Sequence, residues 1–527
     1  MSEGKLNSGR ARSLGRGIAL AALAIAVGNI ASRLLGLVRD STIAFYFGRG
    51  AAVDAYTAAW QVPNTVYDFL INGAISAALV PVFSAYAESD EDEFWKVGSG
   101  IINLAMLVLL LITGLMLWQT PGVINLLVQQ SQVELREETI ALTRLMLPAV
   151  PLMGLSGLIT ALLYARQRFL FPAFVTAVFN LGIIMGAMLF HQRFDVRSLA
   201  IGVLIGALAQ VMLQLPGLRG MRYHFSLGLK HPGTRRVLTL YAPVALGMGF
   251  SVVGIVIDRW LASGFESALS TMRYATTLIQ FPLGLVATAV STAVLPTLSR
   301  QETAADEEGF RRTLGMGIKV VLLLIIPACV GLMMLAQPIV ALLFERGQFS
   351  AQDSAATALA LLCYLPGLPA AAIDQMLLFA FYARKNTLVP NLVQGAAILI
   401  YLLTVLPLIY LSDLGYLSLV LGNSAQWIGH MLLLLFLARR FVTFGGLRIG
   451  EALLKTLAAS AVMAAAIWGL LALTSGSAWL GLPLVQIVLA GSLGAALYFA
   501  CCLLLKVESL SFFVNALMRR IGRRTEA

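Results

Sequence analysis

Charged residues are scarce in this chain of 527 residues. Asp, Glu, Lys and Arg together make up 12% of it, whereas an average soluble protein contains roughly 25%. So few charges cannot cover the surface of a soluble globule of this size. Apolar residues make up 59%, and apolar runs close to the roughly 20 residues that cross a bilayer recur from end to end. The composition therefore predicts an all-α, polytopic membrane protein.

Cysteine and histidine are also rare, with four residues of each type. The cysteines lie in apolar runs without metal-ligand spacing, and the histidines are scattered, so we expect neither a metal site nor a cofactor. The net charge of +11 comes from basic residues in short loops between apolar runs. These loops form no continuous basic patch, which argues against nucleic acid as a partner.

The apolar runs predict about fourteen transmembrane helices. An even number of spans places both termini on one side of the membrane. Lysine and arginine gather in the loops on that side, above all in the 219–236 loop and the C-terminal tail. The positive-inside rule then makes both termini cytoplasmic. The predicted spans lie near 18–47, 52–86, 97–118, 139–165, 170–190, 198–216, 237–263, 268–298, 314–336, 353–383, 388–411, 414–437, 451–474 and 480–505.

The sequence contains an internal repeat. Tyr164-Ala165-Arg166 recurs as Tyr382-Ala383-Arg384 at a shift of 218, and residues 74–84 resemble residues 289–299 at a shift of 215. This offset covers six predicted spans, so the two copies should run parallel, as two six-helix lobes. The predicted organisation is a cytoplasmic tail at 1–17, a first lobe at 18–230, a second lobe at 231–440, and two further helices with a basic cytoplasmic tail at 441–527.

Polar residues form stripes inside several predicted spans. In the first helix, Asn29, Arg33, Gly36 and Asp40 fall within an arc of about 60° on an ideal helix, with Arg39 to one side. The second and eighth helices carry similar stripes, and the seventh carries adjacent charges. Charges inside a membrane usually face a bundle interior or a water-filled cavity. The remaining stripe residues are Asp54, Gln61, Thr65, Asp68, Asn72 and Ser76; Arg273, Thr277 and Gln280; and Asp258 and Arg259.

These stripes predict a cavity between the lobes, and its arginines favour an anionic cargo such as phosphate or pyrophosphate. The alternative is that Arg39–Asp40 and Asp258–Arg259 are end charges that snorkel or pair at an interface. Asp258 is also a candidate ligand for a coupling cation, Na⁺ or H⁺, although a salt bridge with an arginine explains it equally well. The membrane potential is a further candidate driving force.

Residues Ser32 to Asp40, read Ser-Arg-Leu-Leu-Gly-Leu-Val-Arg-Asp, followed by Gly48 and Asp54-Ala55-Tyr56, resemble the opening motif of the MurJ (MviN) lipid II flippases. Phe281-Pro282-Leu283-Gly284 and residues 343–347 also fit that family, which belongs to the multidrug/oligosaccharidyl-lipid/polysaccharide exporter superfamily. The resemblance implies two lobes in a V arrangement that alternate access to the two sides. It implies transport of the undecaprenyl-pyrophosphate-linked peptidoglycan precursor from the inner to the outer leaflet of a bacterial plasma membrane, and hence a role in cell wall biogenesis and cell shape.

The resemblance also assigns residues. Arg33, Arg39, Asp40 and Asp54 match cavity positions of the family, and the last two helices would form a groove for the lipid tail. The family's second helix carries arginines and a glutamate where Tyr67, Asp68 and Asn72 stand here, and its eighth helix has an arginine where Thr277 stands. Arg273, one helical turn earlier, is our candidate substitute. The predicted cargo site thus comprises Arg33, Arg39, Asp40, Asp54, Asp68, Asn72 and Arg273.

Two other functions fit part of these observations. A cation-coupled multidrug or polysaccharide-lipid exporter of the same superfamily would show the same stripes. A membrane enzyme would need paired carboxylates, a metal site or a nucleophile in a large aqueous loop, and the longest loops, 217–236 and 299–313, contain none that we can assemble. We therefore expect a transporter rather than an enzyme, acting as a monomer, with a lipid-linked oligosaccharide precursor and membrane lipids as its partners.

Overall fold

The computed structural model describes residues 3–474 and 481–510, and in these ranges all side chains except those of residues 3–23, 76, 77, 89, 243, 246, 247 and 250. The described residues form helices and connecting loops, with no strand among them. They make up two compact units, Met1–Ser270 and Thr271–Ala527. The predicted basic tail beyond residue 510 lies outside the described residues.

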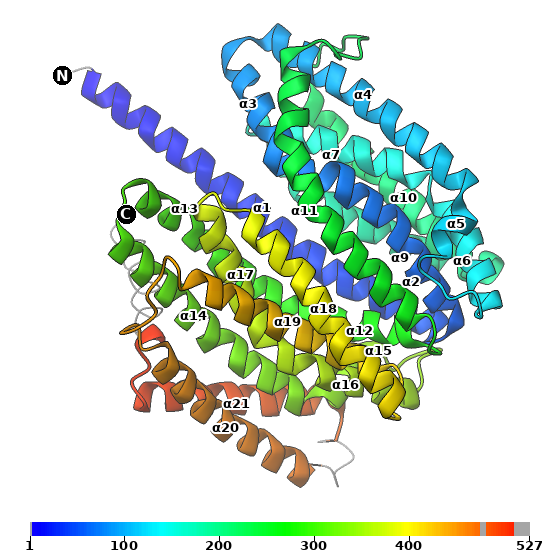
Figure 1. Ribbon diagram of the computed structural model, residues 1–527, viewed down its shortest axis with the longest axis vertical. Helices are drawn as coiled ribbons and strands as arrows, with labels where there is room; N and C mark the ends of the chain where they lie inside the picture. Colours follow the sequence, from blue (N-terminus) through cyan, green and yellow to red (C-terminus); the bar gives the residue numbers. More distant parts are fainter. Residues whose placement is uncertain (1–2, 475–480, 511–527) are drawn as a thin grey trace. The chain divides into compact units, whose positions relative to one another are not determined.

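The helices of the first unit are shown in blue to green in Figure 1. Within this unit α9 and α10 pack side by side, and α9 also packs along α1. The elements are α1 Glu3–Phe47, α2 Ala51–Tyr67, η1 Asp68–Asn72, η2 Ile75–Leu79, α3 Val80–Ser89, α4 Glu91–Trp118, α5 Thr120–Ile124, α6 Val133–Met146, α7 Ala149–Ala165, α8 Leu170–Ala173, α9 Val175–Phe194, α10 Arg197–Gln214, η3 Leu215–Leu218 and α11 Pro232–Ala262.

The second unit contains the rest of the chain, and α12 begins in the last residues of the first unit. Here α18 packs along α19, and α20 packs along both α14 and α21. The elements are α12 Ala268–Pro282, η4 Leu283–Thr288, α13 Ala289–Thr303, α14 Glu307–Met334, α15 Ala336–Phe344, α16 Ala351–Tyr364, η5 Leu365–Gly367, α17 Leu368–Ala383, α18 Leu388–Leu411, α19 Leu417–Ala438, α20 Ile449–Thr474 and α21 Pro483–Leu504.

Among the described residues, ten helices are long and apolar enough to cross a membrane, or eleven if α6 and α7, bent by 45°, form one span. This confirms the polytopic all-α class, while the number fourteen stays a prediction. The three remaining predicted spans coincide with α1, with the stretch from α2 to α3, and with α11.

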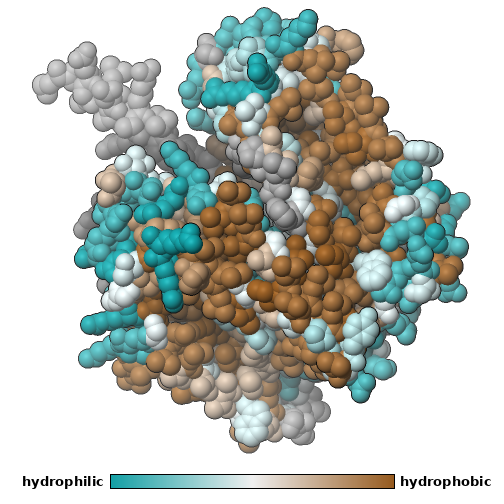
Figure 2. Space-filling view, viewed as in Figure 1, coloured by the Kyte–Doolittle hydropathy of each residue, from teal (hydrophilic) through white to brown (hydrophobic). Residues whose placement is uncertain are grey.

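The surface of the first unit is apolar along its helices. Several leucines of α4 are exposed. Figure 2 shows hydrophobic surface along the sides of the helices of this unit and hydrophilic residues at its ends.

The two copies of the internal repeat share local structure. The π-helical segment η1 begins at Asp68 and η4 begins at Leu283, which are the same 215 positions apart as the sequence matches. A proline precedes each segment, Pro63 in α2 and Pro282 in α12. Proline removes a backbone N–H and crowds the preceding turn, so it favours such departures from α-helical geometry.

The shared Tyr-Ala-Arg sequence ends a helix in each copy. Arg166 pairs with Glu91 at 2.5 Å and lies 5.4 Å above the ring of Phe94. Arg384 pairs with Glu302 at 3.0 Å and lies 5.2 Å above the ring of Phe310. The residue after each arginine has positive φ, 56° in both cases, as expected where a helix ends in a left-handed residue.

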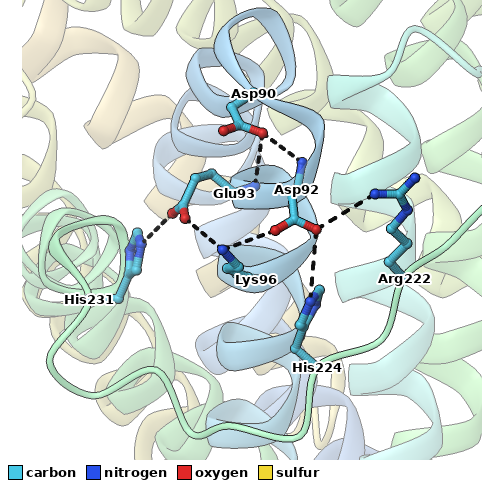
Figure 3. Close-up of polar contacts among 7 residues, drawn as sticks. All are labelled: Asp90, Asp92, Glu93, Lys96, Arg222, His224 and His231. Carbon is cyan, nitrogen blue, oxygen red and sulfur yellow. Dashed lines mark hydrogen bonds and ion pairs between the residues drawn. The ribbon is translucent and has the colours of Figure 1, made fainter.

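The loop that joins η3 to α11 is held against the N-terminal end of α4. Figure 3 shows that His231 contacts Glu93 at 3.2 Å, while His224 and Arg222 approach Asp92 at 4.0 and 3.8 Å. Lys96 lies between the two carboxylates, 2.9 Å from Asp92 and 3.1 Å from Glu93. We call residues 221–231 the docked loop.

Backbone contacts strengthen this docking. Asn103 donates to the carbonyl of Ser226 at 2.8 Å and accepts from the hydroxyl of Tyr223 at 2.6 Å. A Cβ at Gly100 would lie 3.0 Å from the Cα of Gly228, so glycine at position 100 permits this close approach. The docked loop therefore fixes where α11 begins relative to α4.

The carboxylates that hold the docked loop are ionised over a wide pH range. The hydrogen bond from Lys96, followed by weaker contributions from His224 and Arg222, lowers the pKa of Asp92 below its usual 3.8. Lys96 and then His231 likewise lower the pKa of Glu93 below its usual 4.5. A lowered carboxyl pKa means that both carboxylates are ionised above the usual values and lose their charge only as the pH falls through the lowered ones. Both carboxylates are therefore ionised at neutral pH.

Replacing both carboxylates, Asp92→Asn with Glu93→Gln, should release the docked loop because Arg222, His224 and His231 lose their carboxylate partners. We expect backbone hydrogen exchange at residues 224–231 to rise about tenfold, measured by mass spectrometry on the full chain in detergent. Glu88→Gln removes one exposed negative charge nearby and should leave this exchange unchanged. Equal exchange in the double variant and the unmodified chain would contradict the assignment.

Candidate functional site

Asp68 is the centre of a polar cluster on α2 and η1. One oxygen of its carboxylate accepts a hydrogen bond from the side-chain amide of Asn64 at 2.9 Å, and the other accepts from that of Asn72 at 3.0 Å. The spacing of four residues on either side places all three side chains on one helix face. Because both oxygens are held, the carboxylate has a fixed orientation, and its remaining lone pairs are available to a further donor.

This cluster borders a cavity of about 320 Å³ within the first unit. One wall comes from the polar face of α2 and η1, the other from α11, whose contribution is apolar except for a serine. The volume is at the lower end for small-molecule sites. It suits a sugar or a phosphate group rather than a whole lipid-linked saccharide. The lining residues are Gln61, Thr65, Asp68, Phe69, Asn72, Gly73, Met248, Ser251, Val252 and Ile255.

The small residue at position 73 shapes this cavity. A Cβ at Gly73 would lie 2.5 Å from the sulfur of Met248, so a larger residue would push the methionine toward the cavity or away from η1. Gly73 follows η1 directly, where the helix departs from α-helical geometry. Irregular helical turns of this kind recur at functional sites.

Arg39 and Asp40 contact each other and α9 rather than this cavity. The guanidinium donates to both oxygens of Asp40, at 2.9 and 3.0 Å, and a third N–H reaches the side-chain oxygen of Asn180 at 3.0 Å. Asp40 is fully buried. Asn180 also donates to the carbonyl of Ser32 at 3.1 Å. These contacts join α1 to α9 and compensate for the burial of the Asp40 carboxylate.

Asp54, like Asp40, is buried and contacts a second helix rather than the cavity. Its carboxylate is 3% exposed and accepts a hydrogen bond from the backbone N–H of Ser270 at 2.6 Å. Ser270 lies in the first turn of α12, where backbone N–H groups lack partners within the helix. A carboxylate at this place satisfies one of them and interacts favourably with the positive end of the helix dipole.

The other predicted residues are not part of the lining of the described cavity. Arg33 lies partly buried on α1, and Asp258 and Arg259 lie partly buried in the last two turns of α11. Arg273 is partly buried on α12, where the hydroxyl of Thr277 donates to its backbone carbonyl at 3.0 Å. Of the predicted cargo set, therefore, Asp68 and Asn72 border the cavity, together with Gln61 and Thr65 of the same stripe.

Sequence reasoning missed the α11 wall. Met248, Ser251, Val252 and Ile255 give no pattern that separates a cavity wall from a lipid-facing surface. It also missed the π-helical segments, for which Pro63 and Gly73 were available signals. In the part of the chain that the structure describes, no group of three or more His, Cys, Asp or Glu side chains is arranged to hold a metal ion.

Comparison with known proteins gives a consistent result. The family model described as lipid II flippase MurJ matches residues 43–489. A probable lipid II flippase MurJ of Vibrio cholerae serotype O1 is 30% identical over 512 residues, 90% of this chain and 94% of that protein. A probable lipid II flippase MurJ of Rhizobium meliloti is 28% identical over 516 residues, 93% of this chain and 94% of that protein.

Solved structures extend the comparison to the fold. The inward closed conformation of a lipid II flippase MurJ matches with a TM-score of 0.77 and 27% identity, covering 94% of this chain and 100% of that one. An inward-facing multidrug resistance transporter of the MATE family, in the MOP superfamily, matches with a TM-score of 0.65 and 12% identity, covering 80% of this chain and 95% of that one. The second likeness concerns the fold alone.

If the cavity is open to water, thiols placed in it should react with a membrane-impermeant reagent. In a chain whose four cysteines are replaced by alanine, we expect Thr65→Cys and Ser251→Cys to be labelled at least about tenfold faster than Leu403→Cys. Position 403 on α18 is 75% exposed on an apolar helix face, where lipid suppresses formation of the reactive thiolate. Labelling is followed by mass spectrometry in permeabilised membranes. Equal rates at all three positions would rule out a water-filled cavity.

Proposed function

The chain belongs to the lipid II flippase MurJ family, and from that premise we propose that it moves the undecaprenyl-pyrophosphate-linked peptidoglycan precursor from the inner to the outer leaflet by alternating access. It is a multi-pass protein of the bacterial inner membrane, and it transports the precursor that cell wall synthesis uses. The observation that carries the proposal is the polar cavity at Asp68 in a chain matched over 447 residues, 43–489, by the family model. A cavity with one polar and one apolar wall favours a cargo with a polar headgroup and an apolar part.

The orientation follows from charge. The loops on the side of the two termini, among them the docked loop, together with the two terminal tails carry most of the basic residues outside the predicted spans, and such loops remain in the cytoplasm. Both termini are then cytoplasmic, and the carboxylates of α4 that hold the docked loop lie at the cytoplasmic end of that helix. The anionic headgroup of the precursor would be collected from this basic side.

We assign the candidate residues three different tasks. Arg33 and Arg273 bind the pyrophosphate, since a guanidinium donates two parallel hydrogen bonds to phosphate oxygens. Asp68 and Asn72 bind hydroxyl and amide groups of the sugar and peptide, because a carboxylate repels a pyrophosphate but accepts from neutral donors. Arg39 and Asp40 hold α1 against α9. Asp54 accepts a hydrogen bond from a backbone N–H in the first turn of α12.

The last two helices offer a surface for the lipid tail. Tyr498 of α21 donates to the backbone carbonyl of Leu323 of α14 at 2.6 Å, and a buried apolar cluster joins α20 and α21 to α14. On the outside of α20, Leu454 is 69% and Trp468 66% exposed. We propose that the polyprenyl chain lies along this apolar surface while the headgroup crosses.

The decisive test is rescue. Expression of this chain in a bacterium depleted of its own lipid II flippase should restore growth and cell shape, because the depleted cells lack only the step that the chain supplies. Growth is measured after depletion, with an empty vector as the control. Failure to rescue, combined with drug efflux by the same cells, would favour a multidrug exporter instead.

The pyrophosphate assignment predicts a loss of function from one arginine. Arg273→Ala should reduce rescue at least about a hundredfold in plating efficiency, because a buried charge-assisted contact to the cargo is worth roughly 2–5 kcal/mol. Arg236→Ala removes an exposed arginine near the start of α11 and should leave rescue intact. Comparable expression of both variants is verified by immunoblot. Full activity of the Arg273→Ala chain would refute the assignment.

A further inference from the structure

A buried ionisable pair lies inside the second unit, apart from the Asp68 cluster and its cavity. Nδ1 of His430 on α19 is 2.6 Å from a carboxylate oxygen of Asp374 on α17. His430 is 6% exposed, and the side chain of Asp374 is 16% exposed. Both helices belong to candidate membrane spans. Ionisable side chains at such depth are costly and usually have a function.

The internal repeat supplies a matched reference for this pair. At a shift of 218 Asp374 corresponds to Ser156, and at a shift of 216 His430 corresponds to Gln214. The second alignment is supported by Gly206, Ala209 and Gln210, which match Gly422, Ala425 and Gln426. Gln214 donates to the hydroxyl of Ser156 at 2.7 Å. Both copies therefore join their fourth and sixth helices by buried polar contacts at the same positions, but only the second copy can bind or release a proton there.

The two contacts also differ in how completely they are satisfied. In the first copy the oxygen of Gln214 accepts from Thr160 at 2.9 Å, and its amide donates to Ser156 and two backbone carbonyls. The position that corresponds to Thr160 is Leu378, which has no polar group. Nε2 of His430 is accordingly buried without a hydrogen-bond partner.

This geometry links protonation to conformation. With one proton shared between Nδ1 and the carboxylate, Nε2 is a bare lone pair, the pair carries one negative charge, and the observed packing accommodates it. When a hydronium ion transfers a proton to Nε2, the pair becomes neutral overall, which the low dielectric favours. The new N–H then requires an acceptor that this packing does not provide, and a buried unsatisfied donor costs about 1–3 kcal/mol. Protonation therefore favours a different arrangement of α17 and α19.

The surroundings contain few competing charges. Tyr382 on α17 is close enough to interact with the carboxylate of Asp374. The charged side chains on the helices packed against α17 and α19 that the structure describes are engaged elsewhere or lie at helix ends. Glu302 of α13 pairs with Arg384, Lys319 of α14 with Glu508, and Glu308 of α14 with both Arg311 and Arg312, while Asp353 caps α16. The other charged groups there are Arg300 and Glu307, and the uncharged titratable groups are Cys329, Cys363, Tyr364, Tyr401 and Tyr410.

We infer that Asp374 and His430 form a proton-binding site through which protons switch the second unit between two conformations. Its use in driving cargo movement rests on the function proposed above. The sequence alone leaves the driving force open between Na⁺, H⁺ and the membrane potential. The site itself is a property of the free protein. It can be tested without any cargo.

The matched variant is Asp374→Ser with His430→Gln, which installs the contact that the first unit already uses at the same backbone positions. The full chain, labelled with ¹⁵N-histidine, is reconstituted in liposomes, and its four histidines are followed by solid-state NMR between about pH 5 and 8. The spectrum of His430→Gln identifies the His430 signal. We expect this signal to change from neutral imidazole to imidazolium within that range.

Hydrogen exchange supplies the conformational readout. At each pH, the protection of α17 and α19 against exchange is compared between the wild-type chain and the double variant. This ratio should change about tenfold between the ends of the pH range. That is the change expected for two conformations whose proton affinities differ tenfold. Asp374→Asn guards against failure of the double variant to fold. It removes the carboxylate that contacts Nδ1 of His430, so the pH-dependent change in protection should be lost.

The outcomes separate cleanly. A His430 that stays neutral throughout, or pH-dependent protection that is the same in wild type and both variants, overturns the proton site. Charging of His430 together with the variant-sensitive change supports it. Translocation of a lipid-linked precursor in the same liposomes, with an imposed pH gradient, is scored separately. If no precursor moves under any gradient the proposed function fails, while the His430 titration still decides the proton site.

Discussion

Water is absent from the bilayer core, and this constraint governs where the polar side chains of the chain lie. An unsatisfied polar group in hydrocarbon costs several kcal/mol, so each buried charge needs a partner from a neighbouring helix or a wet cavity. Asp40 is satisfied by Arg39 at 2.9 Å, Asp54 by the backbone of Ser270, and Asp68 by two asparagines beside a cavity. The first two solutions join helices together. The third leaves lone pairs facing a space that water or cargo can occupy.

The same constraint explains how much the sequence could predict. Hydropathy reports directly which segments tolerate lipid, so most helices were placed within a few residues of their observed bounds. Periodicity then placed Asp40, Asp54 and Asp68 on polar faces. It could not distinguish their tasks, because Arg39, which pairs with Asp40, is also held by Asn180, and Asn180 lies 141 positions away from Arg39 in the sequence. Which charge is neutralised and which borders a cavity depends on how helices pack, and a single-helix pattern does not contain that information.

The cavity wall on α11 was unpredictable for a related reason. Its residues are apolar or small, and lipid-facing, core-facing and cavity-facing positions look alike when the side chain is valine or isoleucine. The family resemblance gave no warning about Asp374 and His430 either. An ionisable residue in the middle of an apolar run was visible in the sequence at both positions. On α19, Asn423, Gln426 and His430 fall within an arc of about 60° on an ideal helix. A pattern along one helix does not show which other helix supplies the partner, so the pair could not be predicted.

Comparison of the two copies shows that each has specialised a different place in a common framework. The Asp68 cluster has no counterpart in the second copy, where a shift of 215 places Ile279, Leu283 and Ala287 at the positions of Asn64, Asp68 and Asn72. Conversely, the titratable pair between α17 and α19 has a neutral counterpart in Ser156 and Gln214. The π-helical segments and the stacked arginines, by contrast, occur in both copies. Features shared by the copies therefore serve the framework, whereas features confined to one copy are the ones that a transport cycle needs only once: a polar surface for the cargo in the first unit, and a group that changes charge in the second.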